Sequence, residues 1–141
     1  PSNGMDTMKT DMAGAATVIG ALTYAAQRGL KINMVGIAAC CENMPSSKAL
    51  KPGDVIYAMD GTSIEVIDTD AEGRLVLADA LLYSQKYDGK YTIDMATLTG
   101  ACVVALGNVH TGLFTNDDML AKKLIGMAIT INRRIWGYVR K

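Results

Sequence analysis

The amino-acid sequence predicts an α/β fold, a sandwich in which helices cover a mostly parallel central sheet. Three observations lead to this prediction. Segments with apolar residues at helical spacing alternate along the chain with short segments typical of strands. Several strand-like segments are nearly continuous apolar runs, as expected for strands buried on both faces. No internal repeat interrupts this alternation, which is typical of strands joined by crossover helices.

The first elements follow from local patterns. Residues 13–28 are rich in alanine, which predicts a helix that ends at Gly29 and has Asp11 in the position of a cap. Residues 31–39 form a short apolar run, which predicts a buried strand. Residues 40–54 contain two prolines and no periodicity, so we expect a loop.

The later elements begin with a hairpin, because the sequence Asp-Gly-Thr at 60–62 lies between two strand-forming runs. The remaining patterns predict helices over 74–87, 98–107 and 117–130, and strands over 91–97 and 110–116.

The composition excludes several classes of protein. The chain has 141 residues, 50% hydrophobic and 20% charged, which predicts a globular domain with a substantial core. Its 14 basic and 14 acidic residues cancel, so we expect neither nucleic-acid nor membrane binding. Three cysteines without a C-x-x-C pair, and no signal peptide, favour reduced thiols in a cytoplasmic protein. Because the chain starts at Pro1 and ends without a helix stop, we expect one domain, residues 1–141, cut from a longer protein.

The segment IDTDAEGRLVLADAL, at 67–81, places Asp68, Asp70, Glu72 and Arg74 at every second position. A single acid here could stabilise the N-terminus of the following helix by about 0.3–1 kcal/mol. Three carboxylates on one side repel one another, however, and one arginine neutralises only one of them. Sites with several carboxylates suit Mg, Mn, Ca and Zn, so the segment indicates a metal site.

Two interpretations of this metal site compete. In the first, Asp68, Asp70, Glu72 and Asp79 match positions 1, 3, 5 and 12 of an EF-hand calcium loop. An aspartate at position 12 and a preceding hairpin strand, in place of an entering helix, argue against it. In the second, Asp70 and Glu72 coordinate the cations of a hydrolytic site, and Arg74 holds an anion or a developing negative charge. Ligands of open α/β sheets bind where strands end, which favours the second.

The segment DTDAEGRLVLADAL also closely resembles the NTDAEGR signature of the leucyl aminopeptidase family, the cytosolic metallopeptidases of the M17 type. The blocks MDTMKTDMAGAATV, CCENMPSSKALKPGD, ATLTGACVVALG and TGLFTN resemble family blocks in family order, and the likeness covers residues 1–125. The resemblance implies part of the C-terminal catalytic domain, a three-layer αβα sandwich. It also implies a cytoplasmic, hexameric enzyme that releases N-terminal amino acids such as leucine from peptides with two Zn or Mn ions.

The resemblance also assigns roles to individual residues. It implies that three carboxylates are metal ligands and that one arginine holds a bicarbonate acting as general base: Asp11, Asp70 and Glu72, with Arg74. It implies that four residues contact the peptide substrate: Met8 at the first side chain, and Thr97, Leu98 and Gly100 at the backbone.

The sequence departs from the family pattern in two respects. Asp68 stands where the family signature has asparagine, which adds a negative charge. The family's upstream K…FDSGG…K stretch, with two further ligands and a catalytic lysine, is not among these 141 residues. We therefore expect a fragment that is inactive alone. The alternatives are a non-catalytic assembly relative and, less favoured, the calcium-binding module.

The remaining reactive side chains have simpler interpretations. We expect the lone His110 to be structural and the three cysteines to be buried, inert thiols. Lys48 and Lys51 flank the 40–54 loop, and no pattern places them at the metals, so we expect both to be solvated.

Overall fold

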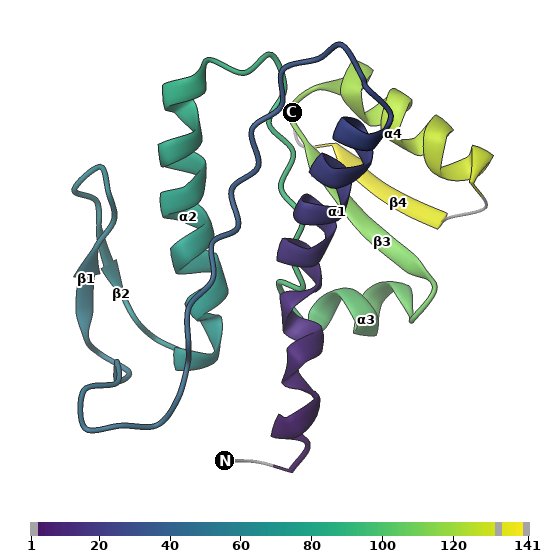
Figure 1. Cartoon of the computed structure of the whole chain (residues 1–141). Helices are drawn as coiled ribbons and strands as arrows, with labels where there is room; N and C mark the ends of the chain where they lie inside the picture. Colours follow the sequence, from purple (N-terminus) through teal and green to yellow (C-terminus); the bar gives the residue numbers. More distant parts are fainter. Residues whose placement is uncertain (1–2, 132–133, 140–141) are drawn as a thin grey trace. The chain divides into compact units, whose positions relative to one another are not determined.

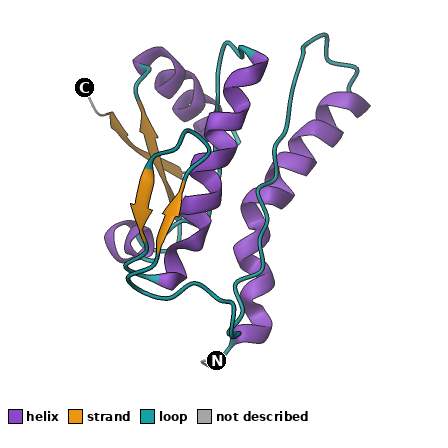
Figure 2. Ribbon diagram, turned by 90° about the vertical axis from the view of Figure 1, so that its left-hand side faces the viewer, coloured by secondary structure: helices purple, strands orange, loops and turns teal. Residues whose placement is uncertain are grey.

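The computed structural model of the chain describes residues 3–131 and 134–139. It divides into two compact units, Pro1–Leu98 and Thr99–Lys141. Both units contain helices and strands (Figures 1 and 2), which confirms the predicted α/β class.

The first unit begins with a 3₁₀-helix, η1 (Met5–Met12), that runs directly into the helix α1 (Ala13–Gln27) (Figure 1). This confirms the predicted helix, and Gly29 follows it with a left-handed φ of 60°, as expected of a residue after a C-cap. The prediction that Asp11 caps α1 is wrong. Asp11 lies inside η1, and no side chain caps the N-terminus of α1.

The predicted hairpin is confirmed. Strands β1 (Val55–Tyr57) and β2 (Ser63–Glu65) pair antiparallel, with Ile56 opposite Ile64. The turn contains Gly61 at a φ of 87°, a conformation that residues with a Cβ rarely adopt.

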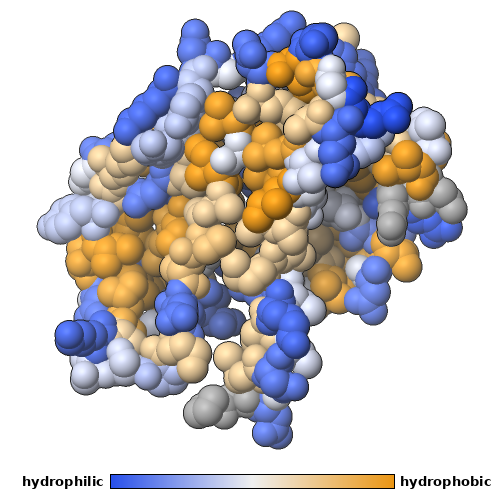
Figure 3. Space-filling view, in the orientation of Figure 1, coloured by the Kyte–Doolittle hydropathy of each residue, from blue (hydrophilic) through white to orange (hydrophobic). Residues whose placement is uncertain are grey.

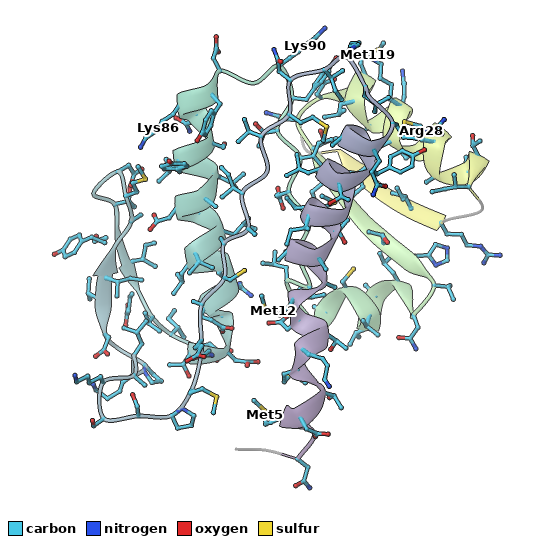
Figure 4. All side chains as sticks on the ribbon, viewed as in Figure 1. Met5, Met12, Arg28, Lys86, Lys90 and Met119 are labelled. Carbon is cyan, nitrogen blue, oxygen red and sulfur yellow. The ribbon has the colours of Figure 1, made fainter. Side chains whose placement is uncertain are left out.

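The carboxylate segment forms two consecutive helices, η2 (Thr69–Ala71) and α2 (Glu72–Ser84). The helix α2 begins two residues earlier than predicted and continues into a last 3₁₀ turn, η3 (Gln85–Tyr87). At this end the ammonium group of Lys86 lies 4.1 Å from the centroid of the Tyr83 ring (Figure 4).

The strands predicted at 31–39 and 91–97 are wrong for the part of the chain that the structure describes. Both segments lie outside helices and strands, and the whole connection from α1 to β1 is drawn as loop in Figure 2. A strand is held by hydrogen bonds to a neighbouring strand, and an apolar run cannot supply that neighbour. The apolar pattern of these segments is typical of strands, but neither segment pairs with a strand among the described residues.

The second unit contains a parallel strand pair joined by a helix. Strands β3 (His110–Thr115) and β4 (Arg134–Val139) pair in parallel, from His110 opposite Arg134 to Thr115 opposite Val139. Parallel strands need a crossover connection, and the helix α4 (Asp118–Thr130) lies between the two strands in the chain. The strand β4 was not predicted. The short helix α3 (Ala101–Leu106) precedes these elements in the same unit.

The buried core is smaller than the length of the chain predicts. Among the described residues only Val66, Ala121 and Ala128 are buried apolar side chains. Large apolar side chains remain exposed, including Ile19 and Tyr24 of α1, and Figure 3 shows such side chains on the viewed face. No described helix is both long and apolar enough to cross a bilayer. The described elements therefore leave these apolar side chains exposed, and the apolar face of an element ordinarily packs against another layer.

Candidate functional site

The four charged residues of the carboxylate segment do not share one side. Asp68 caps η2 by accepting a hydrogen bond of 3.0 Å from the backbone N–H of Asp70, and Glu72 is the first residue of α2. Residues two apart in a helix point in different directions, so spacing at every second position gives one face only in a strand. Arg74 is exposed and makes no ion pair with any described residue. The expected single charged face is therefore wrong.

One carboxylate oxygen of this segment is in an unusual environment. Glu72 Oε2 is buried, yet none of the described residues donates a hydrogen bond to it. Leaving a buried charged group without a partner is costly, and such atoms in proteins ordinarily have a hydrogen-bond donor, a water or an ion. This oxygen is therefore the clearest candidate ligand atom of the described chain.

Two predicted metal ligands affect the pKa of Cys41, a residue of the loop after α1. Desolvation raises the pKa of the Cys41 thiol, and the negative charge of Glu72, the neighbouring Cys40 and the negative charge of Asp11 raise it further. Glu72 and Asp11 therefore both lie near this thiol. The prediction of buried cysteines is wrong for Cys40 and Cys41, which are exposed, whereas Cys102 is half-buried.

Asp11 has a specific partner from the far end of the same unit. The hydroxyl of Thr97 lies 2.5 Å from Asp11 Oδ1 and 3.0 Å from the Asp11 carbonyl oxygen. The structure thus brings a predicted ligand and a predicted substrate-binding residue together across 86 positions of sequence.

Asn43 is a further residue of this region, and no motif in the sequence predicted a role for it. Its side-chain Nδ2 donates a hydrogen bond of 2.9 Å to the carbonyl oxygen of Thr69 in η2. The bond ties the 40–54 loop to the turn that carries Asp70. The only signal in the sequence was the likeness of the whole block CCENMPSSKALKPGD to the family, which gave no role to this asparagine.

The predicted site is only partly assembled. No group of three or more His, Cys, Asp or Glu side chains in the described ranges is arranged to hold a metal ion. Asp11, Asp70 and Glu72 are therefore not gathered into one such group. Met8 and Leu98 belong to the same unit and are exposed, whereas Gly100 precedes α3 in the second unit.

The carboxylates nevertheless suit a divalent cation. Glu72 Oε2 is a buried oxygen without a hydrogen bond, and Asp11 binds Thr97 through only one of its two oxygens. Carboxylate oxygens of this kind are ligands for Mn and Zn as well as for Mg and Ca.

The calcium-loop interpretation fails on the structure. Asp79, its twelfth position, accepts a hydrogen bond of 2.7 Å from the backbone N–H of Met59. The element before the loop is the strand β2, not the entering helix that an EF-hand needs.

The other reactive residues have local partners. His110 Nδ1 lies 3.3 Å from the carbonyl oxygen of Leu106, which agrees with a structural histidine. The ammonium group of Lys51 lies 3.7 Å from a carboxylate oxygen of Asp54, and its side chain is 74% exposed. Both observations agree with the roles expected from the sequence.

Comparison with known proteins decides the family. The family described as "Cytosol aminopeptidase family, catalytic domain" matches residues 1–139. The chain belongs to the cytosol aminopeptidase family. This confirms the resemblance inferred from the sequence motifs.

Individual members of the cytosol aminopeptidase family show how much of a relative this chain matches. It is 50% identical over 136 residues to a "Probable cytosol aminopeptidase" of Chromobacterium violaceum, covering 96% of this chain and 26% of the relative. It is 52% identical to the protein of the same description from Burkholderia multivorans, covering 96% of this chain and 27% of that protein. The chain therefore spans about a quarter of the length of these relatives.

A solved structure of the family has the same fold. A mutant of tomato leucine aminopeptidase superposes with a TM-score of 0.85 at 43% sequence identity, covering 96% of this chain and 27% of that one. The chain therefore has the fold of part of a leucine aminopeptidase.

Proposed function

We propose that the chain is part of the catalytic domain of a metal-dependent aminopeptidase that releases N-terminal amino acids, leucine-like ones in particular, from peptides. Family membership supports the peptidase class, and one observation on this chain supports the metal-dependent mechanism: Glu72 Oε2 is buried without a hydrogen bond. A divalent cation would supply the positive partner that this oxygen lacks.

In this proposal Asp11, Asp70 and Glu72 are the residues that would hold two divalent ions, Zn or Mn. Bound there, the ions would lower the pKa of a water molecule and polarise the scissile carbonyl group. Arg74, which has no ion pair among the described residues, is free to hold an anion such as bicarbonate near that water. The side chain of Arg74 thus supplies positive charge without becoming a ligand itself.

The substrate in this proposal lies beside Thr97. The backbone of the peptide contacts Thr97, Leu98 and Gly100, and the first side chain of the peptide contacts Met8. Met8 and Leu98 are both 48% exposed, so their apolar surface is available to a leucine-like side chain.

The complete enzyme in this proposal is larger than the chain. The chain spans about a quarter of its relatives, and the lysines and aspartate of the family's upstream motif are not among its residues. We propose that the complete protein is a cytoplasmic hexamer with a three-layer αβα catalytic domain around a mostly parallel sheet. The exposed apolar side chains of α1 would then be covered by other layers of that domain.

The first test is Mn²⁺ binding, followed by electron paramagnetic resonance. We expect the chain to bind Mn²⁺ and Glu72→Gln to weaken binding roughly tenfold or more, because a neutral amide is a poorer ligand. Glu65→Gln is the matched control, since Glu65 is an exposed glutamate of β2. Equal binding by all three proteins would contradict the metal assignment.

The second test is hydrolysis of a leucyl anilide. We expect no turnover by the chain alone with Mn²⁺ or Zn²⁺, because it lacks the lysines of the upstream motif. Turnover that disappears in both Glu72→Gln and Arg74→Ala would show that these lysines are dispensable and would overturn the expected inactivity.

A further inference from the structure

The hydroxyl of Thr97 is engaged by Asp11. A threonine hydroxyl carries one proton to donate, and two oxygens of Asp11 lie within reach of it. The hydroxyl lies 2.5 Å from Oδ1, whereas the carbonyl oxygen is 3.0 Å away. The carboxylate oxygen is therefore the main acceptor.

This bond fixes one half of the Asp11 carboxylate and leaves the other half open. Oδ1 accepts from Thr97, and no other described residue donates to Oδ2. Because both residues are exposed, an unheld Asp11 side chain would sample several rotamers in water. One fixed oxygen restricts that motion and defines where the second oxygen points.

The backbone around Thr97 is itself held against η1 and α1. Gly14, three residues after Asp11, has no side chain, and the carbonyl group of Met95 lies directly against it. The approach of Met95 places Thr97, two residues further on, beside Asp11.

We propose that Thr97 is a positioning residue for Asp11: its hydroxyl orients the carboxylate so that Oδ2 can bind a divalent cation. This inference rests on the proposed function, because Asp11 is a ligand only there. The side chain of Thr97 then serves the metal site, and its contact with substrate is made by its backbone. The peptide-binding segment and the metal site are thereby connected through one hydrogen bond.

The test compares Mn²⁺ affinities of three variants by electron paramagnetic resonance, with circular dichroism as a check of folding. Thr97→Val keeps the shape of the side chain and removes the donor, so we expect affinity to fall roughly 10–100-fold. Thr97→Ser keeps the donor and should retain the wild-type affinity. Thr92→Val, in the same segment, is the matched control, because no hydrogen bond of Thr92 to a described residue exists.

A further variant separates positioning from a general loss of structure. In an Asp11→Asn background, Thr97→Val should cause no additional loss of affinity, because Thr97 acts through the Asp11 carboxylate. A loss of equal size in both backgrounds would overturn the inference.

The outcomes distinguish this inference from the proposed function. If Glu72→Gln weakens Mn²⁺ binding but Thr97→Val does not, the positioning role is wrong and the metal site stands. If the chain binds no Mn²⁺, or binds it equally in every variant, both are overturned.

Discussion

The carbonyl oxygen of Met95 occupies the place where a side chain on Gly14 would begin. A Cβ on Gly14 would clash with this oxygen and would also lie 3.1 Å from the carbonyl carbon of Met95 and 3.3 Å from the Cα atom of Ala96. All three atoms belong to the backbone, which cannot turn aside as a flexible side chain can. Glycine at this position therefore permits segment 91–97 to lie against the start of α1.

Gly14→Ala should lower the free energy of unfolding by about 1–3 kcal/mol, the usual cost of forcing extra atoms into a packed contact. Urea denaturation followed by far-ultraviolet circular dichroism measures it. Gly20→Ala is the control in the same helix, because a Cβ there meets nothing within 4 Å. That substitution should stabilise the protein by about 0.5–1 kcal/mol, since alanine favours helix more than glycine does. Stabilisation by both variants would show that the close approach is absent.

Asp117 is the N-cap residue of the helix α4, which joins the parallel strands of the second unit. Its carboxylate accepts hydrogen bonds of 2.8 Å and 3.0 Å from the backbone N–H groups of Met119 and Leu120. Asp117→Ala should therefore lower the free energy of unfolding by about 0.5–2 kcal/mol. Asp117→Asn keeps an oxygen acceptor and should retain most of that stability in the same urea experiment. Equal losses in the two variants would show that charge, and not the cap, matters.

Local features of the fold could be predicted from the sequence. The turn at Gly61, the end of α1 at Gly29 and the start of α4 after Asp117 depend on residues close together in the chain, so short patterns identify them. Segments 31–39 and 91–97 differ, because a strand exists only with a hydrogen-bonded neighbour that the pattern does not specify. The strand β4 was missed for the corresponding reason: its partner β3 lies beyond a whole helix.

In the candidate site, too, short motifs identify individual residues but not the contacts between distant segments. Family motifs predicted Asp11 and Glu72 as metal ligands and Thr97 as a substrate contact. They did not indicate that Thr97 would bond Asp11 across 86 positions, or that Cys41 would lie near both carboxylates. These relationships depend on how distant segments pack, and loop closure over such separations leaves no periodic signal in the sequence.

Asp79 should be a structural residue and not a calcium ligand. Asp79→Ala removes the acceptor for the Met59 N–H and should lower the free energy of unfolding by about 1 kcal/mol, whereas Asp79→Asn keeps an oxygen acceptor. Millimolar calcium should leave the urea midpoint of the wild-type chain unchanged. A calcium-dependent rise that Asp79→Asn abolishes would restore the calcium-loop interpretation.

The reactivity of Cys41 should report the charge of Glu72. Alkylating reagents attack the thiolate. Burial and nearby negative charge both disfavour the thiolate, so the raised pKa of Cys41 lowers its thiolate fraction and slows its reaction. Glu72→Gln removes the larger of the two carboxylate effects, so the pKa should fall and the midpoint of the alkylation rate should move to lower pH. Iodoacetamide labelling across a pH series, in a Cys40→Ser, Cys102→Ser background, measures this midpoint for one thiol.

Glu42→Gln is the matched control, because Glu42 adjoins Cys41 in sequence but is not among the groups that raise its pKa. Mn²⁺ bound at Glu72 should move the midpoint in the same direction as Glu72→Gln, and a midpoint that neither changes would place Glu72 away from Cys41.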